Sequence, residues 1–316
     1  MLNFLYCIDE NYNKQFETSV FSLLENVSEK IKIYVIHKDP DLLRVSQIIL
    51  THKNLDELTI VKFQHPGIDF PNLENTHVSE ATYYRLFLQE YIPVSTKFIM
   101  YMDADIVCIN DPTSSIKKEV NNLTISDKVI SVKSEKIFDE YVDETIERLQ
   151  LTQRNYFNAG VMLIDLNKWF NENLSLKLTN HLDSIRKRIK YWDQDVLNSY
   201  FDGQFIELSE FLNFKLLLNY ENLHIDLVKN SDSDSKIKFI HYTGKYKPWT
   251  VKGALNVNTF FYHKYYAELF KSIYHIKDSR KLNSLKELTH ALLGGSFFKS
   301  KYPIKLLQEI TKSFFN

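Results

Sequence analysis

The stretch Lys97-Phe-Ile-Met-Tyr-Met-Asp103-Ala-Asp105-Ile-Val-Cys-Ile109 predicts the fold and the position of its site. Five consecutive apolar residues between Lys97 and Asp103 are typical of a strand inside a parallel sheet that is covered on both faces. Asp103 and Asp105 follow the carboxyl end of this strand, where open α/β sheets bind their ligands. Side chains at i and i+2 project the same way in extended backbone, so both carboxylates can bind one hard cation. An Asp pair alone is weak evidence, because such pairs are common in turns at strand ends.

The preceding residues alternate between strand and helix patterns. Apolar runs predict strands at Leu2–Ile8, Ile31–Ile36 and Leu58–Phe63. Helical spacing of apolar residues predicts helices around Phe16–Val27 and over Asp39–Leu50. This order predicts a parallel sheet with right-handed crossovers, which places the turn after the first strand at the same edge as the two aspartates.

A third helix is predicted from His77 to Leu88, begun by Ser79 and carrying Arg85. An arginine one element before the Asp-x-Asp strand can pair with a phosphate through two parallel hydrogen bonds. The alternative is a solvated or salt-bridged helix arginine, and this segment by itself favours that alternative.

Residues 111–155 are charged and rich in Thr and Ser, with one helix pattern around Phe138–Leu149. We expect a mobile lid or acceptor loop here. The sequence Asn158-Ala159-Gly160 follows and leads into an apolar strand. Small residues there let the backbone approach a ligand closely, and the Asn158 amide can bind sugar hydroxyls.

A helix over Leu176–Ile189 precedes the sequence Asp193-Gln194-Asp195. These three polar residues either cap a helix or bind a polyhydroxylated substrate, and the sequence supports both readings equally.

A further apolar strand ends at His241 and is followed by Gly244 and Lys247. Histidine is a metal ligand and lysine a phosphate partner, although a single core histidine is more often structural. Because His241 shares one short segment with Gly244 and Lys247, we favour a role for it in ligand binding.

Composition limits the class of protein. The chain has 316 residues, 44% hydrophobic and 14% aromatic, with only 7 Gly and 7 Pro, which suits one large α/β domain or one domain with an appendage. The net charge of −1 gives no basic excess, so no nucleic-acid partner is expected. Cys7 and Cys108 lie in apolar runs and predict buried spectators. No secretion signal or long apolar span is evident, so a cytoplasmic location is expected.

Taken together, these stretches, in this order and at these separations, resemble glycosyltransferase family 8, particularly its bacterial lipooligosaccharide α-galactosyltransferase branch. The resemblance covers roughly residues 1–265. It implies a single-domain GT-A fold, in which a Rossmann-like nucleotide half merges with an acceptor half. It also implies a UDP-hexose donor, most simply UDP-galactose, with Mn²⁺ as cofactor (Mg²⁺ as a substitute) and retention of anomeric configuration.

The same resemblance assigns roles to individual residues. The implied metal ligands are Asp103, Asp105 and His241. The implied uridine contacts are Cys7 (through its backbone), Asp9, Asn11 and Tyr12, with Tyr12 stacking on the uracil and Ala104 near the ribose. The implied sugar and diphosphate contacts are Arg85, Gly244 and Lys247, and those to the transferred hexose are Asn158, Ala159, Asp193 and Gln194. In the family, Gln194 lies beneath the anomeric carbon, and Asp195 is the carboxylate debated as a nucleophile.

One position departs from the family pattern. Where the family commonly has an Asp after the next strand, this chain has Ser134 followed by Glu135. A carboxylate contact is lost if Ser134 takes that position, unless Glu135 replaces it.

A neutral amide such as Gln194 is a poor nucleophile, so we favour front-face attack over a double displacement through Asp195.

The last residues form a basic tail. Residues 277–316 contain eight Lys/Arg and three Asp/Glu, a net charge of +5. Leucines from Leu282 to Leu293, and then Ile304, Leu307 and Ile310, give two helical stripes among lysines. Residues 1–265 are therefore predicted to form the transferase domain, and 266–316 a helical tail that either caps it or lies on an anionic membrane, beside a lipid-linked glycan acceptor.

Three other functions fit part of the same sequence. The Asp103-x-Asp105 pattern also resembles the nucleophile motif of haloacid-dehalogenase-like phosphohydrolases, but this leaves the later motifs unexplained. A UDP-sugar-binding protein without catalysis, or a UDP-glucose-dependent transferase acting on a glycan or glycoprotein, would share the same motifs.

Overall fold

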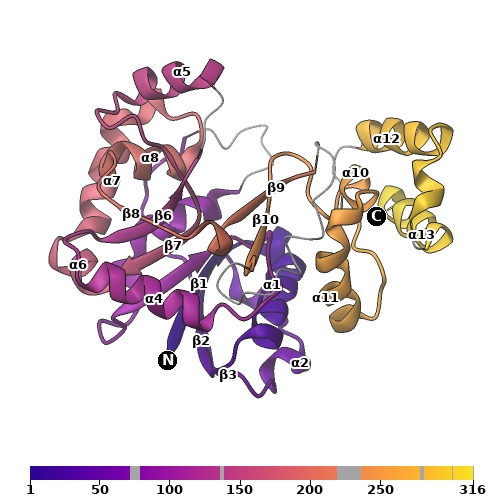
Figure 1. Ribbon diagram of the computed structural model, residues 1–316, viewed down its shortest axis with the longest axis horizontal. Helices are drawn as coiled ribbons and strands as arrows, with labels where there is room; N and C mark the ends of the chain where they lie inside the picture. The colour runs from indigo at the N-terminus through magenta and orange to yellow at the C-terminus, as the bar shows by residue number, and fades with distance from the viewer. Residues whose placement is uncertain (72–78, 136–138, 219–235, 278–280, 301, 316) are drawn as a thin grey trace.

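The structure, a computed structural model, describes residues 1–71, 79–135, 139–218, 236–277, 281–300 and 302–315. A seven-stranded sheet with the order β3-β2-β1-β4-β7-β6-β8 forms its centre (Figure 1). A smaller sheet has the order β5-β10-β9. The strands of the large sheet are β1 Leu2–Ile8, β2 Ile31–His37, β3 Leu55–Lys62, β4 Phe98–Met102, β6 Ile130–Ser134, β7 Phe157–Asp165 and β8 Ile206–Glu207. Those of the small sheet are β5 Ile106–Cys108, β9 Phe214–Leu217 and β10 Phe239–Thr243. The predicted α/β class is confirmed.

Helices cover both faces of the large sheet (Figure 1), because its central strands β1, β2, β4 and β7 are almost entirely buried. In β1, Phe4 and Tyr6 enter one core while Leu5 and Cys7 enter the other, as the two-residue period of a strand requires. The first core contains residues of α1 Asn13–Asn26, α2 Gln47–Leu50, α4 Thr113–Thr124 and α11 Phe260–Phe270. The second contains residues of η3 Glu80–Phe87, α3 Leu88–Tyr91, α6 Leu166–Asn171, α7 Leu174–Ile185 and α8 Trp192–Phe201. Short turns complete these layers: η1 Glu10–Tyr12, η2 Pro40–Leu42, η4 Arg186–Arg188, η5 Glu210–Leu212 and η6 Val257–Thr259.

The strand order produces a crevice at one edge of the sheet. Strand β1 pairs in parallel with β2 on one side and with β4 on the other. The chain therefore adds β2 and β3 on one side of β1 and then crosses back to add β4 on the other side, which makes a topological switch point between β1 and β4. Ligands bind outside the carboxyl ends of strands at such a point. Strand β7 is antiparallel to β4, so its amino end, with Asn158 to Gly160, reaches the same edge. Strand β10 pairs antiparallel with β5, placing His241 opposite Ile106.

The predicted helix over Asp39–Leu50 is wrong. The chain forms only the 3-10 turn η2 and a single helical turn, α2. The backbone between them is extended because Leu43 and Ile49 both pack into the core beside α1. Glu17 of α1 also accepts a hydrogen bond from the Ser46 N–H at 2.8 Å, which holds this extended link.

The prediction of a polar lid over residues 111–155 is also wrong in part. Helix α4 and strand β6 occupy its first half, and α4 buries Ile116 and Leu123. The apolar spacing of that helix is hidden among Thr, Ser and Asn residues. The helix predicted around Phe138–Leu149 is present as α5, Asp139–Leu149, whereas residues 136–138 lie outside the described part of the chain. The two other predicted helices differ in type or bounds. Of 77–88, residues 77 and 78 lie outside the described residues and the rest contains the 3-10 helix η3, followed by α3 from Leu88. The segment 176–189 is α7 followed by η4.

The C-terminal tail lies beside α10 and α11 at one side of the molecule (Figure 1). It packs through a small apolar cluster of its own. Helix α11 spans residue 265, and its Tyr266 and Leu269 belong to the main core. Beyond it, Leu288, Phe297 and Ile310 pack against Val251 of α10. The elements of this region are α10 Val251–Ala254, α12 Lys281–Leu293, η7 Ser296–Lys299 and α13 Pro303–Phe315.

Candidate active site

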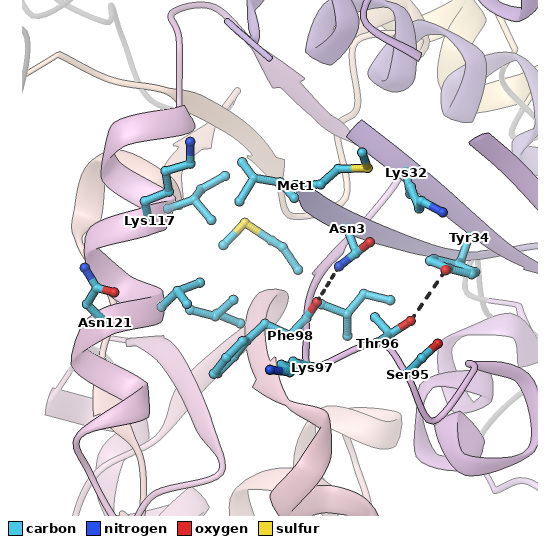
Figure 2. Close-up of a pocket in the computed structure, with 16 residues that line it drawn as sticks. Met1, Asn3, Lys32, Tyr34, Ser95, Thr96, Lys97, Phe98, Lys117 and Asn121 are labelled. Atoms are coloured by element: carbon cyan, nitrogen blue, oxygen red, sulfur yellow. Dashed lines mark hydrogen bonds between the residues drawn. The ribbon is translucent and has the colours of Figure 1, made fainter. Parts of the chain in front are cut away.

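Two cavities of similar size lie at opposite edges of the large sheet. One, of about 600 Å³, lies at the amino ends of β1 and β4 (Figure 2). Polar side chains in its wall already have partners: Asn3 Nδ2 donates to Phe98 O at 3.0 Å, Tyr34 bonds to Thr96 at 3.5 Å, and Lys32 pairs with Glu57 at 2.7 Å. The other cavity, of about 580 Å³, lies at the carboxyl edge. All predicted site residues except Asp9, Asn11 and Asp195 line this second cavity.

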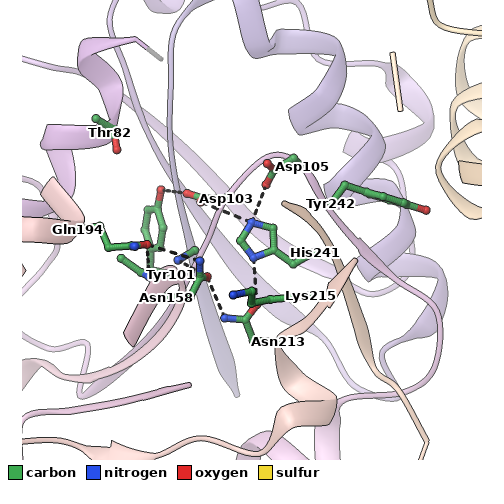
Figure 3. A network of polar contacts seen from close by, with 12 residues as sticks. Thr82, Tyr101, Asp103, Asp105, Asn158, Gln194, Asn213, Lys215, His241 and Tyr242 are labelled. Carbon is green, nitrogen blue, oxygen red and sulfur yellow. Dashed lines mark hydrogen bonds and ion pairs between the residues drawn. The ribbon is translucent and has the colours of Figure 1, made fainter. Parts of the chain in front are cut away.

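Asp103, Asp105 and His241 converge in the second cavity (Figure 3). One ligand atom from each lies within 4.8 Å of the other two. His241 Nε2 is 3.3 Å from Asp105 Oδ1 and 4.0 Å from Asp103 Oδ2. The Asp105 Oδ1 atom is buried without a hydrogen-bond partner, which is the state expected of a metal ligand. Two carboxylates and an imidazole suit a divalent cation such as Mn²⁺, so these residues fit a metal site.

Lysine and histidine keep Asp105 ionised. Burial raises the pKa of Asp105, but Lys247 and His241 outweigh it and hold that pKa well below its usual range. Lys247 Nζ lies 2.6 Å from Asp105 Oδ2 and also donates to the Tyr242 carbonyl at 2.8 Å. The predicted phosphate partner is therefore already directed at the metal cluster.

Asp103 is oriented by groups behind it. Tyr101 donates its hydroxyl hydrogen to Asp103 Oδ1 at 2.5 Å, and Arg85 Nη2 lies 3.2 Å from the same oxygen. Gly160 of β7 leaves the space that both ligands need, because a Cβ there would overlap His241 Cε1 and lie 2.8 Å from Asp103 Oδ2.

Arg85 is buried and holds several parts of the site together. It pairs with Asp193 at 2.8 Å, donates to the Ala159 carbonyl at 2.5 Å, and stacks over the Tyr101 ring at 3.9 Å. Burial raises the pKa of Asp193 to about 6, although Arg85 and Thr82 act to lower it.

The Gln194 amide is fixed by the backbone of β7. Its Oε1 accepts from the Ala159 N–H at 3.1 Å, and its Nε2 donates to the Tyr156 hydroxyl at 3.1 Å. Asp195 instead points away from the cavity and is completely buried. Its carboxylate accepts from Arg148 at 2.6 Å, from Tyr156 at 2.8 Å, and from the backbone N–H groups of residues 190 and 191.

Comparison with known proteins assigns the family. A model described as glycosyl transferase family 8 matches residues 3–253. The chain belongs to glycosyltransferase family 8.

The relatives of this family 8 enzyme include transferases that act on lipopolysaccharide. An Escherichia coli lipopolysaccharide 1,2-glucosyltransferase is 29% identical over 96% of this chain and 90% of its own length. A Salmonella typhimurium lipopolysaccharide 1,3-galactosyltransferase is 30% identical, over 57% of this chain and 52% of its own length. The galactosyltransferase LgtC, solved with donor and acceptor sugar analogues, superposes with a TM-score of 0.65 at 20% identity, covering 85% of this chain and 96% of that one.

These findings confirm the resemblance found in the sequence and the GT-A fold. Membership of a glycosyltransferase family also excludes the phosphohydrolase alternative.

The family 8 enzyme places its predicted uridine residues at the end of β1. Cys7 and Tyr12 reach the cavity together with Ala104, between the two aspartates. Asp9 accepts from the Asn11 N–H at 2.9 Å and shapes this turn, while the Asn11 carbonyl accepts from Lys277 Nζ at 2.6 Å. Both cysteines of the chain are free and buried, and burial raises the pKa of the Cys7 thiol.

The structure places a carboxylate at the position where the sequence left a choice. Ser134 bonds to Glu207 away from the cavity, whereas Glu135 lines it. Glu135 Oε1 lies 2.5 Å from Lys215 Nζ and 3.2 Å from Asn158 Nδ2.

Three residues that support the family 8 site were not predicted from the sequence. Tyr101, Tyr156 and Asn213 each bond to a predicted site residue from behind. Tyr101 is hidden in the apolar run of β4, and Asn213 lies in a short connection with no motif. For Tyr156, the proximity to Asn158 was the one available clue.

Proposed function

We propose that this enzyme transfers a hexose from a UDP-sugar to a hydroxyl of a bacterial lipopolysaccharide-type glycan, with retention of configuration. The observation that carries the donor assignment is the cluster of Asp103, Asp105 and His241 beside Lys247, at the switch point between β1 and β4. The acceptor class is supported by the relatives that act on lipopolysaccharide. Galactose is preferred by branch resemblance, while the Escherichia coli relative that matches 96% of this chain is a glucosyltransferase and supports glucose.

The diphosphate would lie over the carboxyl edge. Asp103, Asp105 and His241 would hold Mn²⁺, which neutralises the negative charge that builds on the leaving diphosphate. Lys247 and the Gly244 turn would contact the phosphates, and Tyr12 would stack on the uracil. Arg85, with its guanidinium already bonded to Asp103 and Asp193, would orient the sugar side of the site.

The hexose would lie against the amino end of β7. Asn158 and Asp193 would bind its hydroxyls, and Glu135, which lines the same cavity, would supply a further carboxylate for the donor or the acceptor. Gln194 would face the anomeric carbon and stabilise its developing positive charge through its carbonyl oxygen.

The environment of Asp195 favours front-face attack. A nucleophile needs a free lone pair directed at the reacting carbon, but four donors occupy this carboxylate and no part of it reaches the cavity. We therefore propose that Asp195 holds Tyr156, and through it Gln194, while the leaving phosphate accepts the acceptor's proton.

Release of UDP from a panel of UDP-sugars, without acceptor, tests the donor assignment. We expect slow hydrolysis of one UDP-hexose with Mn²⁺ and its loss with EDTA, because the carboxylates alone repel the diphosphate. Metal-dependent UDP binding without release from any donor would favour the non-catalytic alternative. An absence of UDP binding would contradict the assignment.

The tail supports a location at the inner face of the cell membrane. None of the helices in the described ranges is long and apolar enough to cross a bilayer. Packing of α12 and α13 on α10 leaves several large apolar side chains exposed in a segment that also carries the exposed Lys286 and Lys305. These are Leu282 at 80%, Leu293 at 85%, Phe298 at 68% and Ile304 at 74% exposure. Such a surface suits an anionic membrane interface near a lipid-linked acceptor.

Replacing these four apolar residues with serine should abolish co-sedimentation with phosphatidylglycerol vesicles. The matched control replaces four exposed apolar residues elsewhere, namely Leu42, Val94, Ile125 and Leu176, and should leave vesicle binding unchanged. Donor hydrolysis should be unaffected in both, because none of the eight lines the cavity. Equal vesicle binding by the two variants would exclude the tail as the membrane contact.

A further inference from the structure

The orientation of His241 is determined by a chain of hydrogen bonds that begins at the backbone of β7. The Gly160 N–H bonds to Asn158 Oδ1 at 3.0 Å. Since a backbone N–H can only donate, this contact identifies the Asn158 atom as oxygen. The other end of the same amide lies 3.2 Å from Glu135 Oε1. Because a carboxylate oxygen only accepts, that end must be the NH₂ group.

Asn213 continues the chain to the imidazole. Its Nδ2 lies 3.1 Å from Asn158 Oδ1 and must donate, because that oxygen only accepts. Its Oδ1 therefore faces His241 Nδ1 at 3.0 Å (Figure 3). An amide oxygen only accepts, so Nδ1 must carry the hydrogen. When the ring is neutral, as metal binding requires, its Nε2 lone pair therefore faces Asp103 and Asp105.

We propose that Asn213 is a positioning residue that fixes the tautomer and ring orientation of His241 for metal binding. Asn213, His241 and Asn158 are all at least nine-tenths buried, so water cannot substitute readily for the missing amide. The same side chain joins the metal ligand to Asn158, which the proposed function places against the hexose. This inference rests on the proposed metal site and adds a residue outside the recognised motifs.

Mn²⁺ affinity, measured by the electron paramagnetic resonance signal of free Mn²⁺, tests this role without relying on turnover. Asn213→Leu should weaken Mn²⁺ binding about 10- to 100-fold, the usual effect of removing the partner of a metal-bound histidine. Asn213→Asp keeps an acceptor for Nδ1–H and should stay within about threefold of wild type, while donor hydrolysis falls because Asn158 loses its donor. Asn198→Leu is the matched control. It removes another buried amide, which bonds to the backbone of Phe157 but not to His241, and it should leave the Mn²⁺ affinity unchanged.

Wild-type affinity in Asn213→Leu would overturn the proposal, as would equal losses in Asn213→Asp and Asn213→Leu. If wild type itself fails to bind Mn²⁺, the proposed metal site is wrong, and the positioning role falls with it. Should Asn213→Leu fail to fold, the tautomer can be measured directly in wild type. With ¹⁵N-labelled histidine and diamagnetic Mg²⁺, we expect His241 to be protonated at Nδ1, and protonation at Nε2 alone would overturn the inference.

Discussion

Gly160→Ala is expected to reduce metal-dependent donor hydrolysis by about 100-fold or more, because displacement of catalytic groups by about 1 Å has effects of this size. The added methyl group would overlap the His241 ring and lie 2.8 Å from Asp103 Oδ2, so the two proposed ligands could not keep their positions. Neither neighbour can move easily. His241 is held by Asn213, and Asp103 by Tyr101 and Arg85.

Mn²⁺ affinity and turnover should therefore fall together in this variant, as measured by resonance titration and UDP release. Gly67→Ala is a suitable control, because a Cβ at Gly67 meets no atom within 4 Å and costs only backbone strain of about 1–2 kcal/mol at its positive φ. That control should lower the melting temperature slightly and leave turnover unchanged. Normal metal binding by Gly160→Ala would show that the ligands do not need the space beside β7.

Gln194→Ala is expected to lose most turnover, about 100-fold or more, while UDP binding stays within about threefold of wild type. The substitution removes the carbonyl proposed to face the anomeric carbon and leaves the metal cluster and the Tyr12 turn intact. The measurements are single-turnover hydrolysis of the donor and UDP titration. Gln204→Ala, which removes a surface amide bonded to Lys128, should change neither quantity.

Unchanged turnover in Gln194→Ala would remove this residue from the mechanism. The same experiment bears on Asp195. If Asp195 were the nucleophile, substantial turnover would survive loss of the neighbouring amide, and a covalent sugar adduct on Asp195 would be detectable by mass spectrometry. Under front-face attack, no adduct is expected in either protein.

The strands of the nucleotide half could be predicted because buried parallel strands have continuous apolar sequences. Leu2–Ile8 and Phe98–Met102 both appear as predicted. The direction of β7 could not be predicted, since an apolar run contains no information about the orientation of its neighbours. The wrong helix at Asp39–Leu50 shows tertiary packing overriding local periodicity, because burial of Leu43 and Ile49 requires an extended link between them.

The proposed metal ligands and sugar contacts could be located because they belong to motifs with fixed spacing. The residues that support them from behind could not be located in this way. Asn213 is effective through one contact with His241 and one with Asn158, and neither contact depends on neighbours in sequence. The buried state of Asp195 was likewise invisible, because its four donors come from distant Arg148 and Tyr156 and from the preceding backbone.

The pairing of β10 with β5 has a consequence for synthesis of the chain on the ribosome. Asp103 and Asp105 are translated well before His241, which follows Asp105 by 136 residues (241 − 105). At about 5–20 residues per second, the nascent chain carries its exposed aspartate pair for on the order of 10 s before the third residue of the cluster is made. The cluster is complete only when the small sheet closes, so no ion or nucleotide that depends on it can assist the earlier steps of folding.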